Sequence, residues 1–297
     1  MKRLMTAAAT AALLTLAACG GSGDDGGESA DASGGAGAVQ AEFSQEAADL
    51  LPQAIQDSGT MTWTAAPKPP FYVDGEDGFT GLGPDLEAAM EQVLGVDIEF
   101  QATDGLNSVL LSLQSGRADF FVGGVRATPE RQQDFDLVGW LTVGPSYLIP
   151  AERADELTEP GDLCGLTVAY EEGSSMESFV TALAEDCAGG SDGELTPLPL
   201  TADGARLAVD SGRADAFAAN ESDSRYIQLQ REGRYEVIVE DTGTSDLTAG
   251  MSLAGSGVGE AMAAAFQALI DQGVYEELMT EWNLADSMVD ESVLNPA

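Results

Sequence analysis

Hydrophobic positions between residues 58 and 125 switch repeatedly between the period of a strand and that of a helix. Residues 61–64 alternate as a strand, and apolar residues from Leu86 to Leu94 then recur at helical spacing and stop at Gly95. The same two patterns follow in residues 96–100 and 106–113. The order strand, helix, strand, helix, strand predicts an α/β unit with a largely parallel sheet covered by helices on both faces.

The rest of the chain continues this plan. We expect a hairpin over residues 71–79, a strand at 166–170 and a helix that begins at Met176. Helical spacing returns from 257 to 270 and again from 273 to 282. A short helix at 43–55 is expected to pack on the folded body.

One pentapeptide occurs twice. Ser-Gly-Arg-Ala-Asp stands at 115–119 and again at 211–215, each time after a helical pattern and before an apolar run. A glycine suits the left-handed cap of a helix, so each copy predicts helix, turn and strand. Chance in a chain rich in Gly, Ala and Asp is the alternative explanation. We interpret the repeat as a sign of two similar lobes that face each other across a cleft.

The predicted lobes are discontinuous in sequence. The first takes residues 58–147 with 247–297, and the second takes 148–246. Two crossings, near 147–150 and near 246–251, would form a hinge. Because ligands of such sheets bind at the carboxyl ends of strands, residues 123–126 are an expected site.

The first residues predict export. Lys2 and Arg3 precede an apolar run to Leu16 that is shorter than the roughly 20 residues of a membrane span, which indicates a signal peptide over residues 1–18. Small residues before Cys19 and a glycine after it are typical of a lipoprotein processing site, in which Cys19 would be acylated. The alternative is an ordinary signal peptide, which would leave Cys19 as an exposed thiol outside the cell. Residues 19–57 are expected to be largely a flexible acidic linker.

Composition excludes several functions. The formal net charge is −39, from 51 acidic and 12 basic residues, which argues against nucleic-acid binding and against electrostatic attachment to anionic lipid. The chain has no histidine, so Ser-His-Asp and Cys-His nucleophilic sites are excluded. Cys164 and Cys187 are expected to form a disulfide outside the cell, and a zinc site is the weaker hypothesis because no histidine could complete it. No metal and no cofactor are predicted.

Taken together, these motifs resemble the extracellular solute-binding proteins of ABC importers, in the type II group for polar amino acids. The resemblance covers about residues 58–285. The matching segments are Pro69-Pro70-Phe71, 81–94 with Asp85, 113–119, Thr128-Pro129-Glu130-Arg131, 165–175, 212–215, and 271–275 with Trp282. It implies a two-lobed periplasmic-binding-protein-like fold with a hinge and an interlobe cleft.

The resemblance also implies a binding site. Arg131 stands where the family clamps the ligand's α-carboxylate, for which a planar guanidinium fork is suited. The backbone at Gly124 and the N–H groups near Ser174 and Ser175 would donate hydrogen bonds, and Ser174 with Glu177 has the spacing of a capping box.

Aromatic side chains complete this predicted site. Phe71 or Tyr72 would cover the apolar part of the ligand. A role for Phe71 in the core is the alternative.

Two positions depart from the family pattern. Arg126 replaces a small hydroxyl residue, and Asn220 replaces the aspartate that accepts from the α-ammonium group. Glu171, Glu172 or Asp74 could take over that acceptor role, and Arg126 could pair with Glu130 instead of a ligand.

We therefore expect a lipid-anchored solute-binding protein, and not an enzyme, on the extracellular face of the cytoplasmic membrane. It would capture a small carboxylate-bearing solute as a monomer and deliver it to a permease and its ATPase. One alternative is an enzyme on the same fold similar to cyclohexadienyl dehydratase, which would need a carboxylic acid in the cleft. Another is a sensor module, against which the end of the chain at Ala297 argues.

Overall fold

The structure is a computed structural model that describes residues 40–76, 78–190, 193–240 and 247–296. These residues belong to one compact unit, residues 36–297. The predicted signal peptide, Cys19 and most of the predicted linker lie outside the described residues. Within the described part, none of the helices is long and apolar enough to cross a membrane.

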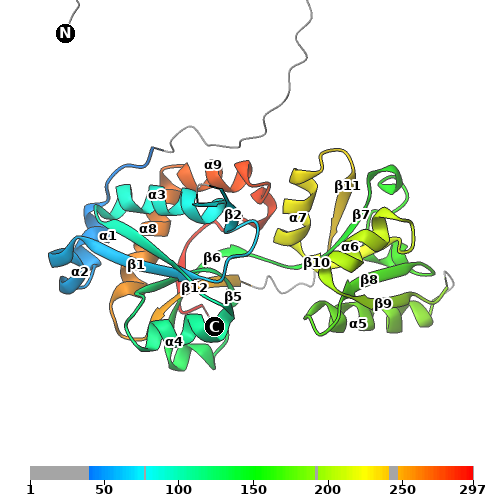
Figure 1. Cartoon of the computed structure of the whole chain (residues 1–297), viewed down its shortest axis with the longest axis horizontal. Coiled ribbons are helices and arrows are strands. Elements are labelled where there is room, and N and C mark those ends of the chain that lie inside the picture. Colours follow the sequence, from blue (N-terminus) through cyan, green and yellow to red (C-terminus); the bar gives the residue numbers. More distant parts are fainter. Residues whose placement is uncertain (1–39, 77, 191–192, 241–246, 297) are drawn as a thin grey trace, which may run out of the picture. The chain divides into compact units, whose positions relative to one another are not determined.

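The first lobe is built on a mixed sheet in the order β13-β6-β12-β5-β1-β4. β1 pairs in parallel with β4 and β5, whereas β12 is antiparallel to β5 and β6 (Figure 1). The strands are β1 (Thr60–Ala65), β4 (Asp97–Ala102), β5 (Phe120–Arg126), β6 (Phe135–Thr142), β12 (Leu247–Leu253) and β13 (Val293–Leu294). A separate hairpin, β2 (Val73–Gly75) and β3 (Gly78–Thr80), confirms the predicted one.

Helices cover this sheet and bury its aromatic residues. They are α3 (Leu82–Leu94), α4 (Gly105–Gln114), α8 (Val258–Asp271) and α9 (Val274–Glu281). Trp140 stacks on Phe266 of α8 with ring centroids 5.2 Å apart, and Trp63 lies 5.4 Å from Phe120. All four side chains are fully buried, which ties α8 to β6 and β1 to β5 through one core.

The second lobe repeats the arrangement with a sheet in the order β11-β7-β10-β8-β9. Its elements are β7 (Pro145–Pro150), β8 (Thr167–Glu171), α5 (Met176–Ala188), β9 (Thr196–Leu200), α6 (Ala202–Asp210), β10 (Ala216–Asn220), α7 (Glu221–Gln230) and β11 (Tyr235–Val239). Two hydrophobic clusters form on this sheet, one with residues of α5 and the other with residues of α6 and α7. Helices therefore cover both faces, as predicted.

The repeated pentapeptide has the same structure in both lobes. Gly116 and Gly212 follow α4 and α6 with φ of 67° and 70°, a conformation that favours glycine. Asp119 and Asp215 then each exchange hydrogen bonds with a threonine of the neighbouring parallel strand. In the first lobe the partner is Thr62, whose N–H donates to Asp119 Oδ2 at 2.8 Å; in the second it is Thr167, at 2.9 Å. The interpretation as two related lobes is confirmed.

The structure moves the first predicted lobe boundary. β7 belongs to the second sheet, so the boundary placed between residues 147 and 148 falls inside a strand. The chain leaves the first sheet after Thr142 and enters the second at Pro145, with only Val143 and Gly144 between them. Residues 145–150, Pro-Ser-Tyr-Leu-Ile-Pro, do not alternate regularly between apolar and polar, and their pattern gives no sign of which sheet the strand joins. After the second crossing, β12 pairs with β6 of the first sheet from Leu247 onward.

The folded body also begins earlier than residue 58. α1 (Gln45–Leu50) and α2 (Gln53–Ser58) are helical, and Ala47, Leu51 and Ile55 are buried in the core of the first lobe. The predicted short helix at 43–55 is thus confirmed as two helices, and the assignment of residues 43–57 to the linker is wrong.

Cys164 and Cys187 form the predicted disulfide. It joins the segment before β8 to the end of α5, where Cys187 is buried against the second lobe's core. The bond closes a loop with a sequence separation of 23.

We expect the double variant Cys164→Ser/Cys187→Ser to unfold with a free energy about 3 kcal/mol lower than the wild type, because the open loop restores entropy to the unfolded chain. Urea denaturation of both proteins measures the difference, and the wild type with reductant should match the variant. Identical denaturation midpoints for variant and oxidised wild type would contradict this expectation.

Candidate functional site

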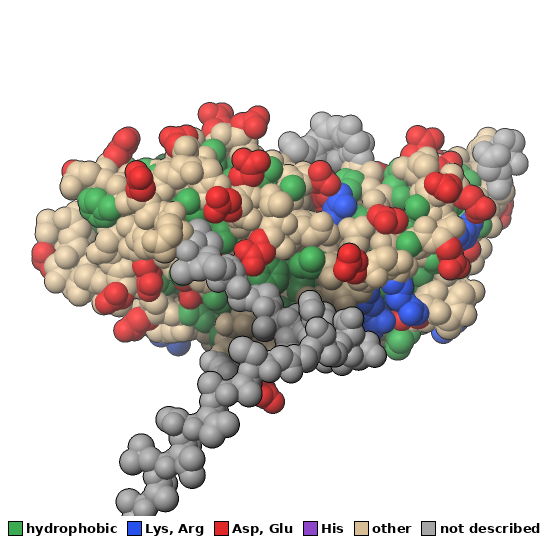
Figure 2. Space-filling view, turned by 90° about the horizontal axis from the view of Figure 1, so that it is seen from above, with side chains coloured by type: hydrophobic (Ala, Val, Ile, Leu, Met, Phe, Trp, Pro, Cys, Tyr) green, Lys and Arg blue, Asp and Glu red, His purple; other side chains and the backbone are tan. Residues whose placement is uncertain are grey.

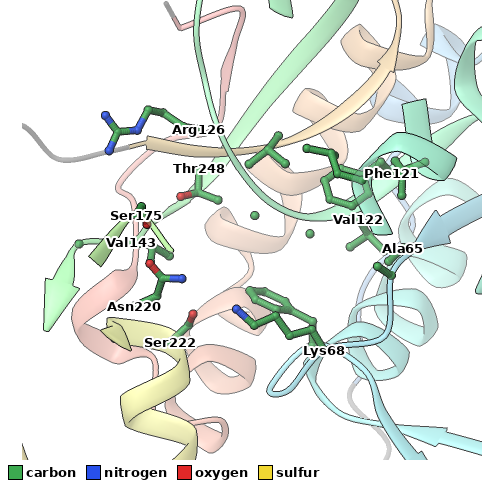
Figure 3. A pocket seen from close by; sticks show the side chains of 18 of the residues that line it. Ala65, Lys68, Phe121, Val122, Arg126, Val143, Ser175, Asn220, Ser222 and Thr248 are labelled. Atoms are coloured by element: carbon green, nitrogen blue, oxygen red, sulfur yellow. The ribbon is translucent and has the colours of Figure 1, made fainter. Parts of the chain in front are cut away.

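A cavity of about 550 Å³ lies between residues of the two lobes. The first lobe lines it with the loop after β1, the end of β5 and the start of β12 (Figure 3). The second lobe contributes the start of α5 and the junction of β10 with α7. The carboxyl ends of parallel strands and the amino ends of helices thus meet in one space, which is where α/β sheets bind ligands.

Six of the seven predicted binding residues line this cavity. They are Phe71, Gly124, Arg126, Arg131, Ser175 and Asn220. The seventh, Ser174, lines an adjoining cavity of about 430 Å³ that shares Lys68, Ser175, Met176 and Asn220 with the first. The structure therefore brings together side chains that span 150 positions of sequence.

Phe71 serves both the core and the cavity. Its ring meets Trp140 edge-on at 6.0 Å between centroids, yet the residue is only half-buried and lines the cavity. Tyr72 is different: it is buried, stacks on Phe100 at 4.1 Å and donates to Glu87 Oε1 at 2.6 Å. The expectation that Tyr72 could cover a ligand is wrong, because its ring is buried against Phe79 and Phe100 in the core and lines neither cavity.

Arg131 lies in the first turn after β5, in the short 3₁₀ helix η1 (Arg131–Gln133). It is half-buried, and its Nη1 donates to the carbonyl oxygen of Arg126 at 2.6 Å. This bond uses one of five guanidinium N–H groups, so the others remain available to oxygen acceptors of a ligand.

Arg126 is exposed, and Figure 3 shows its guanidinium pointing outward from the centre of the cavity.

The start of α5 differs from the predicted capping box. Ser175, not Ser174, is the N-cap residue, and its side chain makes no capping hydrogen bond. Ser174 Oγ accepts from the N–H of Met176 at 3.3 Å, and Glu177 Oε2 accepts from the N–H of Gly173, also at 3.3 Å. Compared with a capping box, the N–H donors to Ser174 and Glu177 therefore each lie one residue earlier in the chain. Ser175 remains exposed at the cavity wall.

Asn220 ends β10 and is the N-cap residue of α7, again without a side-chain capping bond. The next residue, Glu221, is buried, and its Oε1 accepts from Arg225 Nε at 3.3 Å. Burial raises the pKa of Glu221, and the Arg225 guanidinium partly offsets that rise. Glu221 is thus held on its own helix and does not line the cavity.

Several lining residues were missed by sequence reasoning. They include Lys68, Phe121, Phe179, Ser222 and Thr248. Lys68 had a detectable signal, because it is the only lysine after Lys2 in a chain with 51 acidic residues. Its Nζ pairs with Asp223 Oδ2 of the second lobe at 2.9 Å.

The structure also locates the three acidic residues that could accept from an α-ammonium group in place of the family's aspartate. Glu171 lines the adjoining cavity, whereas Glu172 and Asp74 line neither cavity. Among the described residues, no group of three or more acidic or cysteine side chains is arranged to hold a metal ion.

Comparison with known proteins identifies the family. The profile of bacterial extracellular solute-binding proteins, family 3, matches residues 61–285. This chain belongs to that family. The arginine-binding protein ArgT of Corynebacterium glutamicum is 33% identical over 253 residues, which cover 83% of this chain and 81% of that protein.

Solved structures of the family share the two-lobed fold. An ancestral cationic amino acid solute-binding protein matches with a TM-score of 0.67 and 24% identity, over 77% of this chain and 98% of that one. An amino acid ABC transporter substrate-binding protein from Streptococcus pneumoniae bound to L-arginine matches with a TM-score of 0.56 and 25% identity, over 80% and 98% of the two chains. The predicted α/β fold class and the identification as a family 3 protein are confirmed, and the chain is an amino acid-binding ABC transporter protein.

Close packing requires glycine at position 124. A Cβ there would lie 2.5 Å from Cγ2 of the buried Thr248. We expect Gly124→Ala to lower the free energy of unfolding by about 1–3 kcal/mol through overpacking. The double variant Gly124→Ala/Thr248→Ser removes that methyl group and should recover most of the loss in urea denaturation. Equal losses in both variants would show that the clash is not the cause.

Proposed function

We propose that this protein is the lipid-anchored solute-binding component of an ABC importer, and that it captures an amino acid or an amino-acid-like solute by its carboxylate group. The observation that carries the proposal is Arg131, half-buried at the wall of a cavity to which both lobes contribute. A carboxylate in that cavity would meet a planar, permanently charged donor. The backbone of Gly124 from the first lobe and the hydroxyl of Ser175 from the second line the same cavity.

The first crossing between the lobes supports a capture mechanism. Val143 and Gly144 separate β6 from β7 and also line the cavity, so a change of backbone angle there would alter the cavity directly. A solute that binds groups of both lobes stabilises the arrangement in which those groups converge, and this differential affinity drives closure. The closed form would then be the one delivered to the permease and ATPase.

Lipid anchoring is supported by the sequence around Cys19, which lies outside the described residues. An acylated Cys19 followed by an acidic linker would hold the binding unit at the extracellular face of the cytoplasmic membrane. We propose that it acts there as a monomer, because the cavity draws on both lobes of a single chain.

The enzyme alternative is not favoured by the cavity. A dehydratase needs a positioned acid, and none of the described residues that line the 550 Å³ cavity is Asp or Glu. The basic and neutral groups found there suit binding.

The first test of this function is Arg131→Ala. We expect the affinity for the solute, identified by a thermal-shift screen of amino acids and dicarboxylates, to fall at least tenfold in calorimetry, because a charged hydrogen bond contributes about 1.5–3 kcal/mol. The fold should survive, since the side chain lies at the cavity wall and donates to the carbonyl oxygen of Arg126. Arg117→Ala, which removes an exposed arginine of the first lobe, is the matched control. An unchanged affinity would assign Arg131 a structural role.

The second test is Asn220→Asp. Asn and Asp are equally good N-cap residues, so the substitution should leave α7 intact while adding a carboxylate to the cavity. We expect better binding of at least one primary α-amino acid, whose ammonium gains a counter-charge, and weaker binding of the native solute. Paired calorimetric titrations of both proteins against one panel measure this. Micromolar binding of an ordinary amino acid by the wild type, with no gain in the variant, would show that another group holds the ammonium.

A further inference from the structure

The charge of the cavity is opposite to that of the protein. Acidic side chains are scattered over the visible face of the molecule in Figure 2, in keeping with a net charge of −39. The described lining of the 550 Å³ cavity nevertheless includes Lys68, Arg126 and Arg131 and not one acidic side chain. Random placement of 51 acidic and 12 basic residues would favour the reverse.

The basic groups lie at two ends of the cavity. Figure 3 shows Lys68 and Arg126 on opposite sides, and Arg131 is fixed beside Arg126 by its 2.6 Å bond to the Arg126 carbonyl oxygen. The groups between them are neutral: Asn220 and Ser222 point into the space from the second lobe. One carboxylate can use only one of these ends.

Lys68 is held in place by the second lobe. Its ammonium group bonds Asp223 Oδ2 at 2.9 Å, and the Lys68 side chain as a whole is 57% exposed. An ammonium has three N–H donors, so it can keep Asp223 and still donate to a ligand. Asp223 therefore acts as a positioning residue that presents Lys68 to the cavity.

A cationic ligand group finds weaker support. The adjoining cavity contains Glu171, Asp203 and Asp223, but Asp223 is bonded to Lys68 and the Asp203 side chain is 91% exposed. Water screens such an exposed carboxylate strongly. Asn220 offers no charge at all.

We propose that the native solute carries two carboxylate groups, one bound at Arg131 and the other at Lys68. This inference rests on the proposed binding function and names its substrate class: an acidic amino acid or a related dicarboxylate. The protein would then differ from the arginine-binding relatives in what it transports.

The test compares L-glutamate with L-glutamine, which have nearly the same shape and differ in the second negative charge. We expect wild-type protein to bind glutamate at least tenfold more tightly than glutamine in calorimetry. Lys68→Met should reduce that ratio to nearly 1 by weakening glutamate, and Lys68→Arg should retain most of it. Arg117→Met is the control for a basic residue outside the cavity and should leave the ratio unchanged.

A second measurement avoids substitutions. Because Lys68 is the only lysine after Lys2, an amine-reactive reagent labels one side chain of the folded unit, and peptide mass spectrometry reads it alone. Glutamate at saturating concentration should slow this labelling severalfold, and arginine should not. 2-Oxoglutarate in the same panel shows whether the ammonium group contributes.

The outcomes separate this inference from the proposed function. Tighter binding of L-arginine or L-glutamine than of glutamate, or an unchanged ratio in Lys68→Met, would overturn the dicarboxylate assignment and leave amino acid binding intact. If no amino acid or dicarboxylate bound the wild type, both would fail.

Discussion

The direction of parallel strands is the constraint on which the site depends. β1 and β5 of the first sheet and β10 of the second all end at the cavity. There, the backbone N–H and C=O groups of their last residues extend past the hydrogen bonds that join the strands of each sheet. Helices α5 and α7 of the second lobe begin there as well, and their first N–H groups have no partner within the helix. Two such edges that share one space provide hydrogen-bond donors for an anionic solute before any side chain contributes.

The shared architecture of the lobes has a local physical cause. Asp119 and Asp215 begin equivalent strands, and each bonds the adjacent strand through both its N–H group and its carboxylate. Asp215 Oδ1 also accepts from Arg153 Nη1 at 2.6 Å, a contact that anchors the segment after β7. The same five residues thus set the position of a strand edge in each lobe, and the cavity lies beyond the opposite end of these strands.

The basic side chains that line the cavity must attract an anionic solute although the protein as a whole is strongly negative. A net charge of −39 repels a dicarboxylate at long range, but at physiological ionic strength this repulsion is screened beyond about 8 Å. Lys68 and Arg131 line the cavity itself, so their charges act directly on a solute bound there and are less screened than the distant surface charges. The acidic surface then governs solubility, and the cavity governs recognition.

Periodicity by itself determined many of the helices and strands, among them α3, α8 and α9. The repeated pentapeptide indicated two lobes. Both signals are local. Gly124, Arg131 and Asn220 could be placed near the site since each lies in or shortly after the carboxyl-terminal part of a strand. Tertiary structure alone decided that 145–150 joins the second sheet, that Tyr72 is buried and that Lys68 reaches Asp223. Each of these depends on a partner more than 15 positions away or in the other lobe, and no local pattern in a sequence specifies which distant segment a residue will contact.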